Sequence, residues 1–156
     1  MNTVGLYIHI PFCAKKCDYC DFYSLANKLD MVPRYVKSLK AHMDETAMFT
    51  VNMQVDTIYF GGGTPSLLGA DVLCKLLKHI KKRFKVTNNA EITLEANPDS
   101  VDLKMLTALR KTGFNRISFG VQSADDNELS DIGRIHTFSQ AVDAYDNARR
   151  AGFKNI

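Results

Sequence analysis

The chain has 156 residues, 46% of them hydrophobic, and its twenty basic residues nearly balance its seventeen acidic ones. That length suits one domain with one hydrophobic core, and the scattered charge argues against a nucleic-acid-binding surface. No stretch approaches the ~18 consecutive apolar residues that span a bilayer. The first residues lack the features of a secretory signal peptide, so we expect a cytoplasmic protein with reduced cysteines.

Apolar, strand-like runs alternate with helical periodicity along the chain, which is typical of βα units around a parallel sheet. We expect strands at 4–10, 57–60, 91–95 and 116–119. The helices between them should each bury one apolar face. These faces consist of Val32, Val36, Leu39 and Met43, then Leu73, Leu76, Leu77, Ile80 and Phe84, and then Leu103, Leu106 and Leu109.

Local signals mark where several helices begin. Asp30 and Pro33 are expected at the start of the first helix, and residues 97–100 at the turn and cap before the third. Thr137 and Gln140 predict a capping box at the start of a last helix. Such residues satisfy backbone N–H groups that have no partner inside the helix.

The sequence Lys-Thr-Gly-Phe-Asn at 111–115 has an echo, Arg-Ala-Gly-Phe-Lys, at 150–154. Each glycine is expected to end a helix in a left-handed conformation before the chain returns to the sheet. The second echo should lead into a fifth strand, but the sequence stops at Ile156. We therefore expect residues 1–156 to be the N-terminal portion of a longer α/β protein, with about four βα units and an incomplete domain.

Three cysteines, Cys13, Cys17 and Cys20, follow the first predicted strand with the spacing Cys-x3-Cys-x2-Cys. Three thiolates can hold a four-iron cluster and leave one iron open to a small molecule. A zinc site is an alternative and would need a further ligand, for which His9 and Cys74 are the candidates. A thioredoxin-like redox pair would leave Cys13 unused. Cys74 adjoins an apolar helix face, where we expect a small buried hydrophobe.

Glycines and polar residues follow each of the later predicted strands. Residues 61–63 and Thr64 follow the second strand, Glu95 ends the third, and Gln122 follows the fourth. In parallel βα architectures, ligands bind beyond the carboxyl ends of the strands, where these residues should meet. Glycine backbone admits a polar ligand at close range, and Glu95 is suited to accept hydrogen bonds from an amine or a ribose.

Further along the chain, Arg134 offers a rigid guanidinium fork that suits a carboxylate ligand. Two histidines, His9 and His136, could act as metal ligands or as acid-base groups. We favour a structural role for both.

Six motifs in order make the chain resemble a known group of proteins. They are Tyr-Ile-His-Ile-Pro-Phe-Cys, Cys-x3-Cys-x2-Cys, Phe-Gly-Gly-Gly-Thr-Pro-Ser, Glu-Ala-Asn-Pro, Asn-Arg-Ile-Ser-Phe-Gly-Val-Gln-Ser and Gly-Arg-Ile-His-Thr. Together they resemble radical S-adenosylmethionine (SAM) enzymes of the oxygen-independent coproporphyrinogen III oxidase group. The resemblance covers nearly the whole chain.

The resemblance implies the N-terminal part of a partial (β/α) barrel of the radical SAM type. It implies a [4Fe-4S] cluster whose three protein ligands are Cys13, Cys17 and Cys20, with SAM on the fourth iron. The residues implied to contact SAM are Tyr7, Tyr19, Gly62, Gly63, Thr64 and Glu95, while Gln122 and Arg134 match positions that bind a second SAM molecule in the oxidases.

Two branches of this group differ just after the third cysteine. The decarboxylating oxidases carry a fourth cysteine where this chain has Phe22, in a Cys-Asp-Phe sequence that resembles the heme chaperones. The resemblance therefore implies a protein that binds heme and passes it to respiratory acceptor proteins, and that needs an electron donor. The alternatives are an oxidase that acts on coproporphyrinogen III and a radical SAM enzyme with another substrate.

Overall fold

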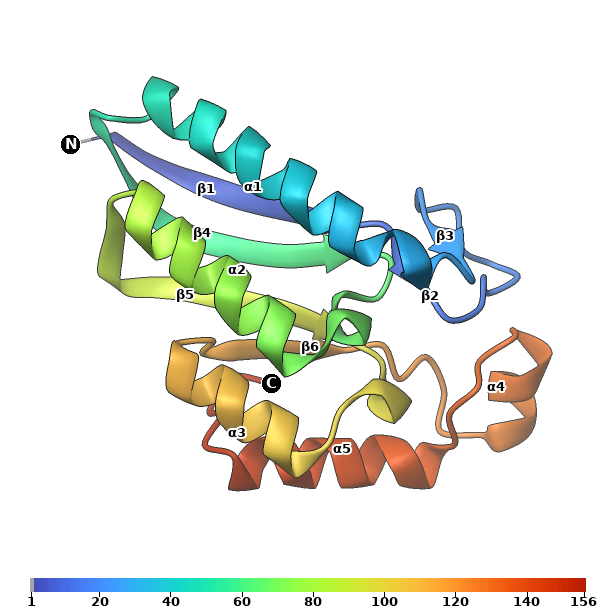
Figure 1. The fold of residues 1–156 in the computed structure, drawn as a ribbon. Coiled ribbons are helices and arrows are strands. Elements are labelled where there is room, and N and C mark those ends of the chain that lie inside the picture. The colour runs from blue at the N-terminus through green and yellow to red at the C-terminus, as the bar shows by residue number, and fades with distance from the viewer. Residues whose placement is uncertain (1) are drawn as a thin grey trace.

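The centre of the fold is a parallel sheet of four strands in the order β1-β4-β5-β6 (Figure 1). The computed structural model describes residues 2–156. All four predicted strands are confirmed, and the first three run beyond their predicted limits because the ladder continues past the apolar stretches. The bounds are Asn2–Ile10 for β1, Met53–Gly62 for β4, Val86–Ala96 for β5 and Arg116–Phe119 for β6.

Helices connect the strands, as expected for βα units, and α1 and α2 lie across one side of the sheet (Figure 1). Three short 3-10 turns precede helices at 29–31, 65–68 and 98–100. Two short strands, β2 (Phe12–Cys13) and β3 (Leu25–Ala26), form a separate small sheet. The helices are α1 (Val32–Phe49), α2 (Gly69–Arg83), α3 (Leu103–Thr112), α4 (Asp126–Asp131) and α5 (Phe138–Arg150).

The core lies between the sheet and these helices, and α2 contributes most regularly to it. The predicted face of α2 is confirmed, since Leu73, Leu76, Leu77 and Ile80 are all fully buried. On α1 only Met43 is buried, whereas the other predicted residues are partly buried against the core. α1 follows β1, which is the edge strand, so fewer neighbours cover it. Each fully buried leucine contributes about 2 kcal/mol of hydrophobic stabilisation.

The start of α3 differs from the prediction. Residues 98–100 form a separate 3-10 turn, and the helix cap is Asp102, whose carboxylate accepts the Met105 N–H group at 2.7 Å. The predicted capping box of α5 is confirmed. Thr137 Oγ1 accepts the Gln140 N–H group at 3.3 Å, and Gln140 Oε1 accepts the Thr137 N–H group at 2.8 Å.

Both echoed glycines take the predicted left-handed conformation, with φ of 122° at Gly113 and 95° at Gly152. The second one returns the chain to the sheet edge. Asn155 forms a single parallel bridge with Arg116, and the Ile117 N–H group donates to the Asn155 carbonyl oxygen at 3.1 Å. This bridge lies where the fifth strand was expected.

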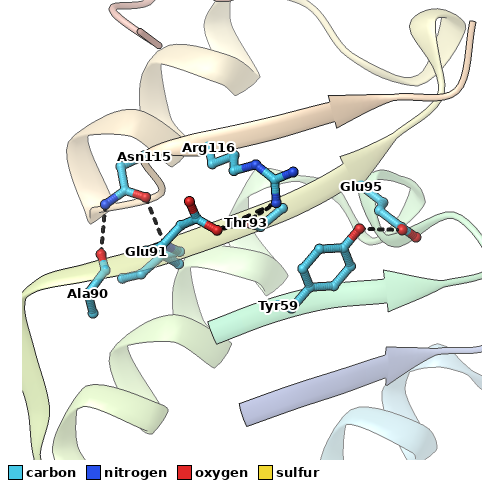
Figure 2. A network of polar contacts seen from close by, with 8 residues as sticks. Tyr59, Ala90, Glu91, Thr93, Glu95, Asn115 and Arg116 are labelled. Carbon is cyan, nitrogen blue, oxygen red and sulfur yellow. Dashed lines mark hydrogen bonds and ion pairs between the residues drawn. The ribbon is translucent and has the colours of Figure 1, made fainter. Parts of the chain in front are cut away.

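The two faces of the sheet differ in chemistry because side chains alternate along each strand. Ile58, Phe60 and Leu94 point toward the helices and are buried. Tyr59 and Glu95 alternate with them on the opposite face, where Figure 2 shows them side by side. Within residues 2–156, no helix has the length and apolar character needed to cross a membrane.

Candidate metal centre and cofactor pocket

The cysteine loop runs from β2 to β3, and these two strands pair in parallel at its base. Cys13 ends β2 and is buried, whereas Cys17 and Cys20 lie within the loop and are half-buried. The Cys20 N–H group donates to the Cys17 carbonyl oxygen at 3.1 Å and forms a turn. All three cysteines therefore lie on one short segment that is hydrogen-bonded within itself.

Two side chains brace this loop. Lys16 Nζ donates to the Phe22 carbonyl oxygen at 2.6 Å and to Ser24 Oγ at 3.3 Å. His9 Nε2 lies 3.0 Å from the Tyr23 carbonyl oxygen, a distance that fits an N–H donor at that nitrogen. This bond gives His9 the structural role expected from the sequence.

A pocket of about 280 Å³ opens at the carboxyl ends of the strands, beside the cysteine loop. It brings together every predicted metal or cofactor residue except Tyr7. The predicted residues among its lining are Cys13, Cys17, Cys20, Tyr19, Gly62, Gly63, Thr64, Glu95, Gln122 and Arg134. Residues separated by more than a hundred positions thus share one cavity, as parallel βα architecture predicts.

The glycine segment packs directly against the cysteine loop. A Cβ atom on Gly63 would lie 2.7 Å from the Phe12 carbonyl oxygen, so only glycine fits there. The N–H groups of Gly63 and Thr64 donate to the carbonyl oxygens of Ile10 and Phe12 at 2.8 and 2.7 Å. Gly62 needs its φ of 111°, and its N–H group also donates within the protein. The glycines therefore let the backbone of the cysteine loop approach closely, and their N–H groups already donate to acceptors within the protein.

Glu95 is held at the pocket wall by two donors. Its Oε1 atom accepts the Tyr59 hydroxyl at 2.6 Å (Figure 2), and its Oε2 atom accepts the Gly62 N–H group at 3.2 Å. Burial and the carboxylate of Glu95 raise the pKa of Tyr59 to about 12, so the hydroxyl remains a donor at neutral pH. Each carboxylate oxygen has a second lone pair, so Glu95 can still accept a ligand's amine or hydroxyl.

Tyr7 lies outside the pocket lining, on β1 directly beside Tyr59. The two rings stack with their centroids 6.0 Å apart, and the Tyr7 hydroxyl lies 3.3 Å from His9 Nδ1. Burial, and then the carboxylate of Glu95, raise the pKa of Tyr7. Tyr7 thus supports the tyrosine that holds Glu95.

The loop after β6 places two further pocket residues. Gln122 has a φ of 74°, which is rare for a residue with a side chain and costs on the order of 1 kcal/mol. His136 is buried, and its Nε2 atom lies 3.1 Å from the Val121 carbonyl oxygen. Burial, and then the charge of Arg134, lower the pKa of His136. A neutral His136 that holds this loop has the structural role expected from the sequence.

The side chains present fit a cluster with a small-molecule ligand. Three thiols line one pocket, and the Arg134 Nε atom is buried without a partner beside them. Within residues 2–156, no set of three His, Cys, Asp or Glu side chains converges as the ligands of a single metal ion would. Thiolates of a four-iron cluster bind different irons, so they need not converge on one point.

Sequence reasoning missed some residues that matter here. Tyr59 was not predicted, although strand alternation places it on the same face as Glu95, and neither was the brace formed by Lys16. Cys74, predicted to be buried, is half-buried between α2 and α3, where its Sγ atom accepts the Thr112 hydroxyl at 3.0 Å.

Comparison with known families decides which cluster chemistry the pocket belongs to. The model of the radical SAM superfamily matches residues 7–156. The chain belongs to the radical SAM superfamily. Membership implies a [4Fe-4S] cluster and SAM, and it confirms the partial (β/α) barrel expected from the motifs.

Similar proteins include the heme chaperone HemW of Escherichia coli, 41% identical over 158 residues, and that of Haemophilus influenzae, 40% identical over 161 residues. Both alignments cover 100% of this chain and 42% of the relative. Among solved structures, coproporphyrinogen III oxidase (HemN) from Escherichia coli superposes with a TM-score of 0.91 at 29% identity, over 98% of this chain and 36% of that one. The chain thus spans about two fifths of the length of these relatives.

Proposed function

We propose that residues 1–156 are the cluster-bearing portion of a radical SAM core domain in a heme chaperone. Support comes from relatives of that name that match the chain from end to end while extending well beyond it. The bridge between Asn155 and β6 also supports a sheet that continues past four strands.

Within this proposal, Cys13, Cys17 and Cys20 each bind one iron of the cluster, and SAM occupies the fourth. The shared pocket and the bonded loop of the three cysteines support this ligand set. When bound, the cluster and SAM would supply one-electron radical chemistry, driven by an external electron donor.

The remaining residues hold and orient the cofactor. Glu95, fixed by Tyr59 and Gly62, accepts hydrogen bonds from the amine or ribose of SAM. Tyr19 is half-exposed at the pocket and forms part of its outer wall. Burial raises the pKa of Tyr19, so its ring stays uncharged next to the cluster site.

One observation carries the choice of a chaperone over an oxidase. Phe22 lines the pocket at the position where the oxidases have a fourth cysteine, and the residue is 69% exposed. A phenylalanine offers no thiol to metal or substrate, whereas its exposed ring offers apolar contact area. The proposed partners are heme, a respiratory protein that accepts it and an electron donor, in the reducing cytoplasm that a cluster on free thiols requires.

The second candidate is an oxidase that decarboxylates coproporphyrinogen III. Its support is the likeness to the Escherichia coli oxidase together with Gln122 and Arg134, which both line the pocket.

Titration of the full-length protein with heme separates the two candidates. The chaperone function predicts one heme bound per chain by absorbance and no protoporphyrinogen formed from coproporphyrinogen under anaerobic, reducing conditions. Turnover of coproporphyrinogen would establish the oxidase instead. The Escherichia coli oxidase, assayed in parallel, shows that the conditions support turnover.

A further inference from the structure

Arg134 ties together three loops that lie far apart in the sequence. Its Nη2 atom donates to Asn97 Oδ1 at 2.8 Å and to the Gly120 carbonyl oxygen at 2.6 Å. Its Nη1 atom donates to Cys17 Sγ at 3.6 Å. The loops after β5 and β6 are thereby linked to the cysteine loop through one side chain.

No carboxylate of residues 2–156 forms an ion pair with this guanidinium. The acceptors of Nη2 are an amide oxygen and a backbone carbonyl, both of them neutral. A partly buried cation without an ion-pair partner among the described residues therefore lies in hydrogen-bond contact with the sulfur of a proposed cluster ligand.

A cation and an N–H···S hydrogen bond both favour the more negative state of an iron–sulfur cluster. Reduction by one electron makes the cluster more negative, so both interactions stabilise the reduced form. Screening by water is weak because the guanidinium is partly buried and its Nε atom is inaccessible to solvent.

We infer that Arg134 is a positioning residue that donates to the Cys17 thiolate and raises the reduction potential of the cluster, which eases electron entry. The inference rests on the proposed function, since it requires the cluster. It goes beyond the second-SAM role implied by the resemblance. Both hydrogens of Nη2 are donated to acceptors within the protein, so this nitrogen holds the two loops together.

The test is a redox titration of the anaerobically reconstituted protein, followed by electron paramagnetic resonance (EPR). Arg134→Gln removes the charge and is expected to shift the midpoint potential to a more negative value. Arg134→Lys keeps a charge without the fork and should shift it less. The control is Arg110→Gln, because Arg110 lies outside the pocket, donates to the Gly152 carbonyl oxygen at 3.0 Å, and should leave the potential unchanged.

An unchanged potential in Arg134→Gln, with a cluster that still binds SAM, would overturn the inference and leave the proposed function intact. A wild-type protein that assembles no cluster would instead overturn the proposed function, and the inference with it. If Arg134→Gln alone fails to assemble the cluster, the test uses wild-type protein labelled with ¹⁵N-arginine. Pulsed EPR should then detect ¹⁵N coupling to the reduced cluster, since Arg134 is the only arginine that lines the described pocket. Absence of that coupling would overturn the inference.

Discussion

The two faces of the sheet are built from the same strands and serve different purposes. The face toward the helices carries Ile58, Phe60 and Leu94, which are buried, stabilise the fold and lie outside the pocket lining. The opposite face carries Tyr59 and Glu95, which are joined by a hydrogen bond (Figure 2). Because side chains alternate along a strand, one residue packs into the core while its neighbour in the sequence lies on the face that carries Glu95.

The largest expected effect lies in the cysteine loop at the ends of these strands. Replacing Cys13, Cys17 or Cys20 with alanine should abolish the [4Fe-4S] cluster, because each thiolate is the sole protein ligand of one iron in the proposed site. Iron and sulfide content and absorbance after reconstitution measure this. Cys74→Ala is the matched control and should retain the cluster. Loss in Cys74→Ala, or retention in the loop variants, would contradict the ligand set.

On the helix side, Leu77→Ala should lower the free energy of unfolding by about 3 kcal/mol, because it leaves a cavity in the packed core. Urea denaturation followed by circular dichroism measures the change. Leu103→Ala on α3 is the control and should cost far less, since Leu103 is only partly buried and lies outside the core cluster. Equal losses in the two variants would show that the core is not where the structure places it.

On the opposite face of the sheet, Tyr59→Phe should weaken SAM binding by about 2- to 10-fold, because one hydrogen bond that fixes Glu95 is lost. The affinity is measured from the change in the cluster EPR spectrum on titration with SAM. Tyr145→Phe serves as the control, since its hydroxyl contacts Arg149 on α5 and lies away from the pocket. Unchanged affinity in Tyr59→Phe would mean that Glu95 is positioned without it.

A smaller effect should come from His136, which lies behind the pocket loop. Its folded-state pKa is below the ordinary value of 6.5, so unfolded chains bind its proton more readily. Stability should therefore be full above about pH 6.5 and fall as the pH drops below it. Thermal unfolding across this range measures the trend, and His136→Gln should flatten it. A wild-type protein that becomes more stable on acidification would contradict the buried, neutral state of His136.

Most of the fold could be predicted from the sequence because its signals are local. These signals depend on residues close together in the chain. They are the apolar runs of the strands, the apolar face of α2, both glycine caps and the capping box at Thr137. The cap of α3 lies beyond the predicted segment 97–100, because residues 98–100 form a separate 3-10 turn and the Asp102 carboxylate accepts the Met105 N–H group.

The sequence predicted which residues line the candidate site better than it predicted the contacts between them. Positions at strand ends gave the pocket residues, since parallel strands collect their carboxyl ends on one side. The contact of Arg134 with Cys17 joins residues 117 positions apart, and the Tyr59–Glu95 bond depends on strand register. No local pattern reports such distances, which is why the role of Tyr59 was overlooked.

The central claim is that three cysteines hold a four-iron cluster whose remaining iron binds SAM. It is tested most directly by EPR spectra of the reduced, reconstituted protein with and without SAM. We predict a [4Fe-4S] signal whose shape and g-values change on addition of SAM. A signal that is identical with and without SAM, or a protein that takes up zinc in place of the cluster, would contradict the account.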